Sequence, residues 1–594
     1  MTTSVVAPPR LKSISPLAHP SYRGPLLAVP VWLATTAAGF ALVGYADPDP
    51  FTVRGAVLSL AVFGLLAMVA LPVGLRLRGN CAVVCGLFAG WLATALRAAL
   101  NGTPYGFAGL YGDMGRIAAA ATRYTATPWS ADAFVEEVPA EYPMLYPWLI
   151  GRASVLSGVP AWRLVAEAEI LTVSGAVVAA FLLWTRLVRA PIALGIVVAG
   201  VVAFGDPRKA FGVLTVLMLT PWVLLAFGTP PRGRLQWWAA GLIGGLMVMT
   251  YQGYLMYGAP GILAVAALAW WRSGSRRAYV LHVLGVLAVA FAVSACYVVP
   301  YAWAYVTAGG QQVADLYIAP DLAASPFPFL QPTPLGLLQF AGLAGTVFYR
   351  RSTWWAAPLL CLIAGAYVYR VLMMTRFVID GHTGFYHYTS RLLGPLLAAA
   401  GVLAVATMLR RKGWSRYAAA ALSVLVLWAG VSYWRISLPE DTSPWREVWP
   451  SREHYRTAQA HREPVPGEKG ALPVARIERA VERAMGPGAR PRVLAFDERL
   501  YAFLPWRGYL AVDRTSANTL SFWDDRRAEL ARLAEVTDPA GFTRASAATA
   551  FGPIDVFVLK SWRWRDIRFR PAQFSHGFEV VDDLPDHTVL LIRE

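Results

Sequence analysis

Residues 101–163 begin NGTPYGFAGLYGDMGRIAAAATRYT and end VPAEYPMLYPWLIGRASVLSGVPAWR. This is the first long polar stretch of the chain, and it follows three apolar segments. It carries an isolated acid, Asp113, at the start of a helix-like run, and then an acidic cluster among prolines and aromatic residues, Glu136, Glu137 and Glu141. Because the segments around it are long enough to cross a bilayer as helices, we predict that this stretch is a loop at one face of a membrane.

The chain outside this loop is far more apolar than a soluble protein. Its 594 residues are 56% hydrophobic and only 15% charged. Apolar segments of roughly 20 residues, the length of a membrane-spanning helix, recur about 13 times. The expected spans cover residues 25–45, 55–75, 81–100, 164–185, 190–205, 210–228, 236–252, 255–271, 278–300, 335–349, 354–373, 391–409 and 417–435. The fold class is therefore a polytopic α-helical membrane protein.

The charge pattern predicts how these spans are oriented. The net charge is +17, yet residues 440–594 contain 23 basic and 23 acidic side chains, so the whole excess lies in the membrane part. Basic residues recur in alternate loops between Arg76 and Arg416, as the positive-inside rule requires when the N-terminus is cytoplasmic. The loop 101–163 and the C-terminal part then lie outside the cell. Because no long basic stripe exists, we predict no nucleic-acid partner.

The composition also divides the chain into parts. Residues 1–24 predict a disordered cytoplasmic tail, residues 25–435 the membrane domain, and residues 436–594 an extracytoplasmic soluble α/β domain. In that domain, strands are expected at 491–496, 509–513, 555–560 and 587–593, with a helix inside 516–536. It contains no phosphate-binding loop, nucleophile elbow or metal-ligand spacing. Its tryptophans could stack on sugars or pack a core, and these are Trp506, Trp523, Trp562 and Trp564.

The aromatic segment 301–334 also lands outside the cell in this topology. It is rich in tryptophan, tyrosine, phenylalanine and proline. A loop of this length without secondary structure is usually functional or disordered, so a lid over the outer face is favoured slightly over a plain connector.

Asp113 is the best candidate for chemistry. An ionisable side chain under an irregular loop at a membrane face is a functional candidate. It could act as a general base that takes a proton from an acceptor hydroxyl. A helix N-cap is the other use of an acid at this place, and the two interpretations have about even weight.

A lipid-phosphate substrate would need cations near this base to neutralise the departing phosphate. The outer loops contain seven candidates, and these are Arg116, Arg208, Lys209, Arg376, His382, His387 and Arg391. The alternative for such residues is a solvated turn or a side chain that reaches out to the membrane surface. The acidic cluster Glu136, Glu137 and Glu141, with Tyr142 beside it, completes the candidate substrate-binding set.

Four segments carry a resemblance to a known family. They are GDMGRIAAAATRYTATPWSADAFVEEVPAEYPMLYPWLIGRAS (112–154), GVPAWRLVAEAE (158–169), YLAVDRTSANTLSFWDDRRAELARLAEV (509–536) and FGPIDVFVLK (551–560). The chain resembles the GT-C class of polyprenyl-phosphate-sugar glycosyltransferases and, within it, the galactan arabinofuranosyltransferase family of the AftA type. It departs from the family pattern at Met114, Met144 and Thr519, which leaves the acceptor open.

The resemblance implies a multi-pass enzyme of the plasma membrane. It would transfer arabinofuranose, with inversion, from decaprenylphosphoryl-arabinose to cell-wall galactan, with Asp113 as the base and Arg116 beside it. A lipid phosphate is a fair leaving group, so no cofactor is required, and a divalent cation stays an open alternative. Three other functions also stay open: the same chemistry with another sugar or acceptor, a flippase for lipid-linked glycans, and a non-catalytic wall-binding scaffold.

Overall fold

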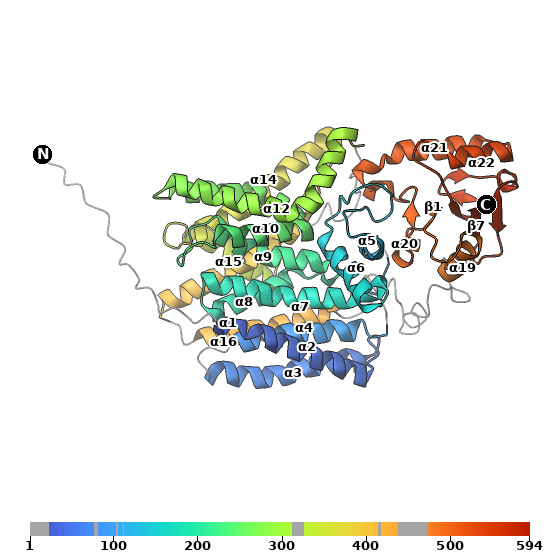
Figure 1. The fold of residues 1–594 in the computed structure, drawn as a ribbon. Helices are drawn as coiled ribbons and strands as arrows, with labels where there is room; N and C mark the ends of the chain where they lie inside the picture. Colours follow the sequence, from blue (N-terminus) through green and yellow to red (C-terminus); the bar gives the residue numbers. More distant parts are fainter. Residues whose placement is uncertain are drawn as a thin grey trace.

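The computed structural model describes residues 23–76, 81–102, 105–107, 109–110, 112–311, 326–413, 417–437 and 472–594. A bundle of apolar helices forms one part of the molecule, and an α/β domain lies at one end of it (Figure 1). The predicted disordered tail lies outside the described residues except for its last two, and so does the centre of the predicted lid, residues 312–325.

The helices of the bundle correspond one for one with the predicted spans. In the described residues, nine helices are long and apolar enough to cross a bilayer, and four further apolar helices bring the set to the predicted 13. Their bounds are α1 Arg23–Leu26 with α2 Ala28–Ala46, α3 Val53–Arg76, α4 Cys81–Ala99, α7 Ala161–Leu187, α8 Ala190–Phe204, α9 Ala210–Ala226, α10 Trp237–Tyr251, α11 Gly253–Trp271, α12 Arg276–Ala308, α13 Pro334–Phe348, α14 Ala356–Asp380, α15 Thr389–Arg411 and α16 Ala418–Ser437. The prediction of a polytopic helical membrane protein is confirmed.

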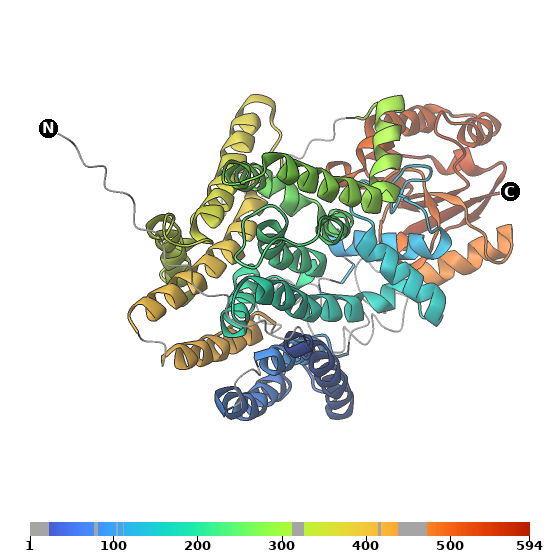
Figure 2. The ribbon, with the colours of Figure 1, turned by 60° about the vertical axis from the view of Figure 1, so that its left-hand side comes forward.

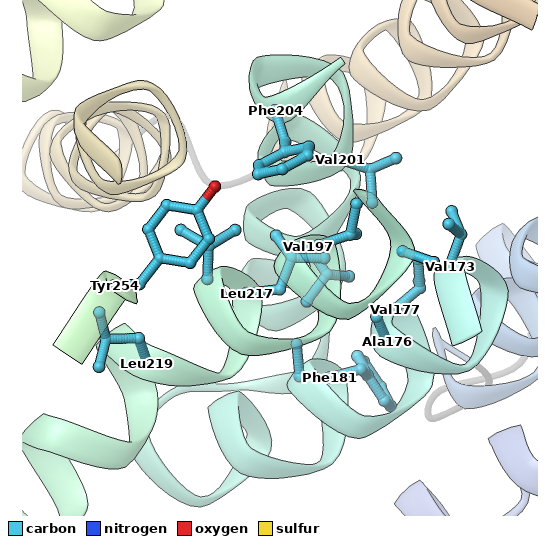
Figure 3. Close-up of a cluster of buried hydrophobic side chains, with 14 of the residues drawn as sticks. Val173, Ala176, Val177, Phe181, Val197, Val201, Phe204, Leu217, Leu219 and Tyr254 are labelled. Atoms are coloured by element: carbon cyan, nitrogen blue, oxygen red, sulfur yellow. The ribbon is translucent and has the colours of Figure 1, made fainter. Parts of the chain in front are cut away.

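The centre of the bundle is built from α7, α8 and α9. Figure 3 shows Val177 and Phe181 of α7 beside Val197 of α8 and Leu217 of α9, and all four side chains are buried. In a bilayer, such close van der Waals contact is a main force that holds helices together. The short 3₁₀ turn η1 (Pro207–Lys209) joins α8 to α9 and is therefore held at the end of this packed core.

The helix α12 shows why the bundle belongs in a membrane. It exposes a line of apolar side chains three or four residues apart, among them Leu284, Leu287 and Phe291, each more than half exposed. Such a line is a lipid-facing surface in a bilayer. The helix has 33 residues, so it is about 50 Å long and exceeds the roughly 30 Å of a hydrocarbon core. Its last turns meet the soluble domain, where Tyr301 and Ala304 pack against the core of that domain.

The soluble domain contains a mixed sheet with helices around it. Its elements are α19 Val474–Met485, β1 Arg492–Ala495, α20 Leu500–Phe503, β2 Arg507–Gly508, η6 Arg514–Ser516, η7 Thr519–Ser521, α21 Trp523–Glu535, α22 Pro539–Ala547, β3 Val556–Lys560, β4 Arg563–Trp564, β5 Ile567–Arg568, η8 Pro571–Phe574, β6 Phe578–Val581 and β7 Thr588–Arg593. Strand β1 pairs in parallel with β2 and β3, whereas β7 pairs antiparallel with β3 and β6. The predicted strands at 491–496, 555–560 and 587–593 are β1, β3 and β7.

The predicted strand at 509–513 is wrong, because the structure has only the two-residue strand β2 just before it. The cause is a competing acceptor. The carboxylate of Glu498 accepts hydrogen bonds from the backbone N–H groups of Val512 and Asp513, at 2.8 and 3.2 Å. These donors are then not available for a strand ladder.

The tryptophans of the domain mostly pack its interior. Trp506, Trp523 and Trp564 are buried, and the indole N–H of Trp564 donates to the carbonyl of Ala495 at 2.9 Å. The structure therefore supports core packing, rather than stacking on sugars, for these three tryptophans.

The polar stretch 101–163 links the two parts of the molecule. It contains α5 (Gly112–Ala126) and α6 (Leu145–Ser157), which lie between the bundle and the soluble domain in Figures 1 and 2. Met114, Ile117 and Ala118 of α5 belong to the core of the bundle, whereas Ala119 belongs to the core of the soluble domain. The run of alanines lets both cores approach this one helix closely.

Candidate active site

Asp113 lies in the first turn of α5, which begins at Gly112 with φ +54°. That backbone conformation favours glycine. The turn is also tight at Gly115, where a Cβ atom would come 2.2 Å from the carbonyl oxygen of Leu110. Asp113 is thus inside the helix rather than at the residue before it, and its charge suits the positive end of the helix dipole.

The carboxylate of Asp113 forms an ion pair with Lys209 of η1. The distance from Lys209 Nζ to Asp113 Oδ2 is 2.6 Å. The side chain of Asp113 is 44% exposed and that of Lys209 is 15% exposed, so the lysine lies deeper than the acid. Burial alone would raise the pKa of Asp113, but the Lys209 ammonium, with smaller contributions from Arg116 and Arg391, outweighs it and holds this pKa below its usual value. Asp113 is therefore ionised at neutral pH.

Lys209 has a second partner, Tyr388 of the 3₁₀ turn η4 (Tyr386–Tyr388). Its ammonium donates to the Tyr388 hydroxyl at 2.7 Å and lies 4.6 Å from the centre of that ring. His387, which is buried, lies against Tyr388 with ring centroids 4.4 Å apart. The turn that carries the candidate His387 is thus in contact with the turn that carries the candidates Arg208 and Lys209.

Two further cations are gathered by Asp206, which lies between α8 and η1. Arg208 donates to Asp206 through Nε at 2.8 Å and through Nη2 at 3.0 Å, and Arg391 donates through Nη1 at 2.8 Å. Burial would raise the pKa of Asp206, but the two guanidinium groups outweigh it and lower this pKa strongly. The guanidinium group of Arg391 also lies 5.6 Å from the centre of the Tyr388 ring, the same ring that Lys209 contacts.

Aromatic side chains form the wall beside these charges. The ring of Tyr142, which is 42% exposed, lies 6.0 Å from Phe211 and 6.4 Å from Tyr251. Tyr257 stacks on Tyr388 with nearly parallel rings 6.2 Å apart. The half-exposed ring of Tyr142, supported by buried aromatic rings and close to a carboxylate, is a surface on which a sugar ring can lie.

The site does not fit a divalent cation. Among the described residues, no group of three or more His, Cys, Asp or Glu side chains is placed to hold a metal. Asp113 and Asp206 are both paired with cationic side chains. A metal ion there would have to displace a lysine or an arginine.

The acidic cluster of the loop has different partners. Glu136 accepts from Arg492 Nε at 2.6 Å and from Arg507 Nη1 at 2.7 Å, both in the soluble domain. The two arginines outweigh the effect of burial and lower the pKa of Glu136. The side chain of Glu137 is 80% exposed and reaches Arg492 only at 3.5 Å.

Glu141 joins three parts of the molecule. Its carboxylate accepts from the backbone N–H of Thr519 at 2.6 Å, from the Thr519 hydroxyl at 2.7 Å and from the hydroxyl of Tyr301 on α12 at 3.1 Å. Arg116, one turn after Asp113, donates to the carbonyl of Ser516 and lies 3.7 Å from Glu498. Both residues therefore tie the loop to the soluble domain.

Arg376 and His382 form their own group at the end of α14. Arg376 Nε is 3.0 Å from Asp380 Oδ2, and the backbone N–H of His382 donates to Asp380 Oδ1 at 2.9 Å. The structure thus brings Asp113, Lys209, Arg208, Arg391, His387 and Tyr142 to one region, and places Arg376 and His382 around a different carboxylate.

Sequence reasoning missed two members of the site, Asp206 and Tyr388. Both were visible as polar residues in the segments that interrupt the apolar spans, DPRK and HTGFYHYTSR. A carboxylate before two basic residues suggests a local ion pair, but its bond to Arg391 joins residues far apart in the chain, which no local pattern reveals.

Comparison with known proteins identifies the family. A family model described as "Arabinofuranosyltransferase N terminal" matches residues 36–428, and a model described as "Arabinofuranosyltransferase A C terminal" matches residues 457–576. A galactan 5-O-arabinofuranosyltransferase of Mycobacterium tuberculosis (strain ATCC 25618 / H37Rv) is 26% identical over 474 residues, which are 76% of this chain and 72% of that protein. The protein of the same name from Mycolicibacterium smegmatis is 25% identical over 459 residues, 74% of this chain and 72% of that protein.

A solved structure, the oligosaccharyltransferase of Archaeoglobus fulgidus, is also similar, with 12% identity and a TM-score of 0.36 over 85% of this chain and 73% of that one. The two family models cover the membrane helices, the loop that carries Asp113 and most of the soluble domain. The protein therefore belongs to the arabinofuranosyltransferase family of glycosyltransferases.

Proposed function

We propose that the protein transfers arabinofuranose, with inversion, from decaprenylphosphoryl-arabinose to a hydroxyl group of cell-wall galactan. The observation that carries this proposal is the meeting of one ionised, half-exposed carboxylate, Asp113, with three cations at the end of the bundle, Lys209, Arg208 and Arg391. The galactan acceptor is suggested by the names of the relatives. The lipid donor is suggested by a cationic site at the end of membrane-spanning helices.

The reaction needs a base and an anion site next to each other. Asp113 accepts the proton of the acceptor hydroxyl while the hydroxyl oxygen attacks the anomeric carbon of the donor. The bond between that carbon and the phosphate oxygen breaks, and the electron pair leaves with the phosphate. Cations held in fixed positions stabilise the charge that grows there. Asp206 keeps Arg208 and Arg391 in place, so little reorganisation is needed during the reaction.

We also propose that the site faces the outside of the plasma membrane and that the N-terminus is cytoplasmic. The alternation of basic loops supports this orientation. It is tested with single cysteines in a background from which Cys81, Cys85, Cys296 and Cys361 have been removed. Ser575→Cys in the soluble domain is expected to react with an impermeant thiol reagent in intact cells, whereas Ser352→Cys between α13 and α14 is not. The opposite result would invert the topology.

The decisive experiment is a transfer assay with the purified full chain in lipid nanodiscs. Radiolabelled decaprenylphosphoryl-arabinose and a galactan oligosaccharide are supplied together, and the product is identified by its mass and linkage. We expect one arabinofuranose on the galactan, in the anomeric configuration opposite to that of the donor. Polyprenyl-phosphate mannose serves as the competing donor. Transfer from mannose but not from arabinose, or no product with either donor, would contradict the proposal.

A further inference from the structure

Lys209 is distinct among the cations of the site because its carboxylate partner is the proposed base. Arg208 and Arg391 have a carboxylate of their own, Asp206. Lys209 instead contacts Asp113 at 2.6 Å. A base that is paired with an ammonium group is weak, because the pair must lose its favourable charge interaction when the acid takes a proton.

The charges of the cluster favour an anionic ligand. The three cations Lys209, Arg208 and Arg391 face two carboxylates, Asp113 and Asp206, so one positive charge is in excess. A sugar phosphodiester carries one negative charge. An ammonium group has three N–H donors, and two of those of Lys209 are used, by Asp113 and by the Tyr388 hydroxyl.

Other groups also face the carboxylate, but with weaker effect. Charged and titratable side chains from four elements and from the loop surround Asp113, and these are Arg116 on α5, Lys209 on η1, Tyr251 on α10, Arg391 on α15 and Tyr142. In the part of the chain that the structure describes, Lys209 is the member of this set in direct contact with Asp113. A change in the position or effective charge of Lys209 therefore changes the basicity of Asp113 most.

We propose that Lys209 changes its partner when the lipid donor binds. In the free protein its ammonium is paired with Asp113, and in the donor complex it is paired with the donor phosphate instead. Asp113 is therefore a stronger base in the donor complex than in the free protein. This inference rests on the proposed function. During transfer, the acceptor proton goes to Asp113, the new bond forms at the anomeric carbon, and the electron pair of the broken bond goes to the phosphate. Lys209 then lies beside the leaving group and stabilises its second negative charge.

The proposal is tested by two pH profiles of the wild-type protein. The kcat/KM for the donor reports the free protein, and the kcat/KM for the galactan oligosaccharide at saturating donor reports the donor complex. We expect the donor profile to stay flat down to about pH 5, because Lys209 keeps the pKa of Asp113 low. The acceptor profile is expected to fall at a pH about one unit or more higher, the usual effect of losing a close opposite charge.

Substitution of Lys209 gives the second arm. In Lys209→Met the ion pair is absent, so both profiles are expected to share one acidic limb, and the KM for the donor is expected to rise. Lys560→Met is the matched control, since Lys560 forms a comparable 2.7 Å pair with Asp586 in the soluble domain. The Lys560→Met variant is expected to keep two pH profiles whose acidic limbs lie at different pH values. If Lys209→Met turns over too slowly for a profile, the wild-type pair of profiles decides alone.

Three results are informative. Two separate wild-type limbs that merge in Lys209→Met support the proposal. Coinciding limbs in the wild-type protein, or two limbs that persist without Lys209, overturn it. A wild-type protein that transfers no arabinofuranose at all overturns the proposed function itself, which distinguishes the two failures.

Discussion

Two sets of acidic side chains lie on the same polar segment, and their surroundings are opposite. Glu136 is 12% exposed and uses both of its oxygens to bind arginines of the soluble domain, whereas Asp113 is 44% exposed and is paired through one oxygen with one lysine. A carboxylate clamped between two guanidinium groups cannot take a proton without breaking both pairs. A half-exposed carboxylate with a single cationic partner has only one pair to break. The difference separates an acid that joins the loop to the soluble domain from an acid that is exposed beside the cation cluster, as the proposed base must be.

The comparison is tested most strongly by Asp113→Asn. Asparagine fits the first turn of a helix but cannot accept the proton, so we expect turnover to fall on the order of 100-fold or more. Asp113→Glu keeps the charge but displaces it by about one methylene group and should retain little activity. The rate of arabinose transfer and the melting temperature in detergent are measured together. Normal transfer by the Asn variant would move the search for a base to the glutamates.

A smaller loss is expected at the cation cluster. Arg391→Ala removes one guanidinium group from the proposed phosphate site and should raise the barrier by roughly 2–4 kcal/mol, the usual effect of losing one charge-stabilising donor. The amount of protein in the membrane should stay normal. Arg476→Ala is the control, since Arg476 pairs with Asp583 on the surface of the soluble domain. Equal rates for the two variants would remove Arg391 from the site.

Glu136→Gln should affect stability more than chemistry. It leaves the nearly buried Arg492 without its carboxylate, which costs about 1–3 kcal/mol for a group of this kind. The pKa of Glu136 is lower in the folded protein than in the unfolded chain. Its contribution to stability is therefore present above the unfolded pKa of about 4.3 and is lost as the pH falls through the folded value. Melting temperatures of the wild type and of Glu136→Gln should thus converge under acidic conditions.

Glu137→Gln is expected to have the smallest effect. Its neighbour shares the same arginine, but Glu137 itself is 80% exposed and its contact is long. Exposed ion pairs contribute little to stability. Both the melting temperature and the transfer rate should match those of the wild type within error. A large loss in either quantity would show that the two glutamates act as a unit.

The sequence predicted what depends on local patterns. Apolar length located all 13 membrane helices, and short apolar runs located β1, β3 and β7. Asp113 was identified because an isolated acid in a polar loop is conspicuous. The partner of Asp113 was named only as one of several cations, since Lys209 is almost a hundred residues further along the chain and no periodic pattern connects them.

The acidic cluster shows a second limit of prediction from sequence, because its partners are also distant in the chain. Glu136, Glu137 and Glu141 were predicted as substrate-binding residues from their charge and position. Their partners Arg492, Arg507 and Thr519 lie more than three hundred residues away in the chain. The sequence shows which side chains can bind an anion or a cation. The packing of the folded chain decides which of them are already paired with another residue of the protein. Their role toward a substrate stays a prediction.

The position of α5 between two cores has a consequence for how this enzyme tolerates mutation. An ordinary amphipathic helix accepts almost any side chain on its outward face. The alanines of α5 face the bundle at Ala118 and Ala121 and the soluble domain at Ala119, and all three are buried. Adding even one or two methyl groups at any of them would overpack a core. Variation along the helix that carries Asp113 should thus be suppressed at consecutive positions, and this helix can diversify only where neither core touches it.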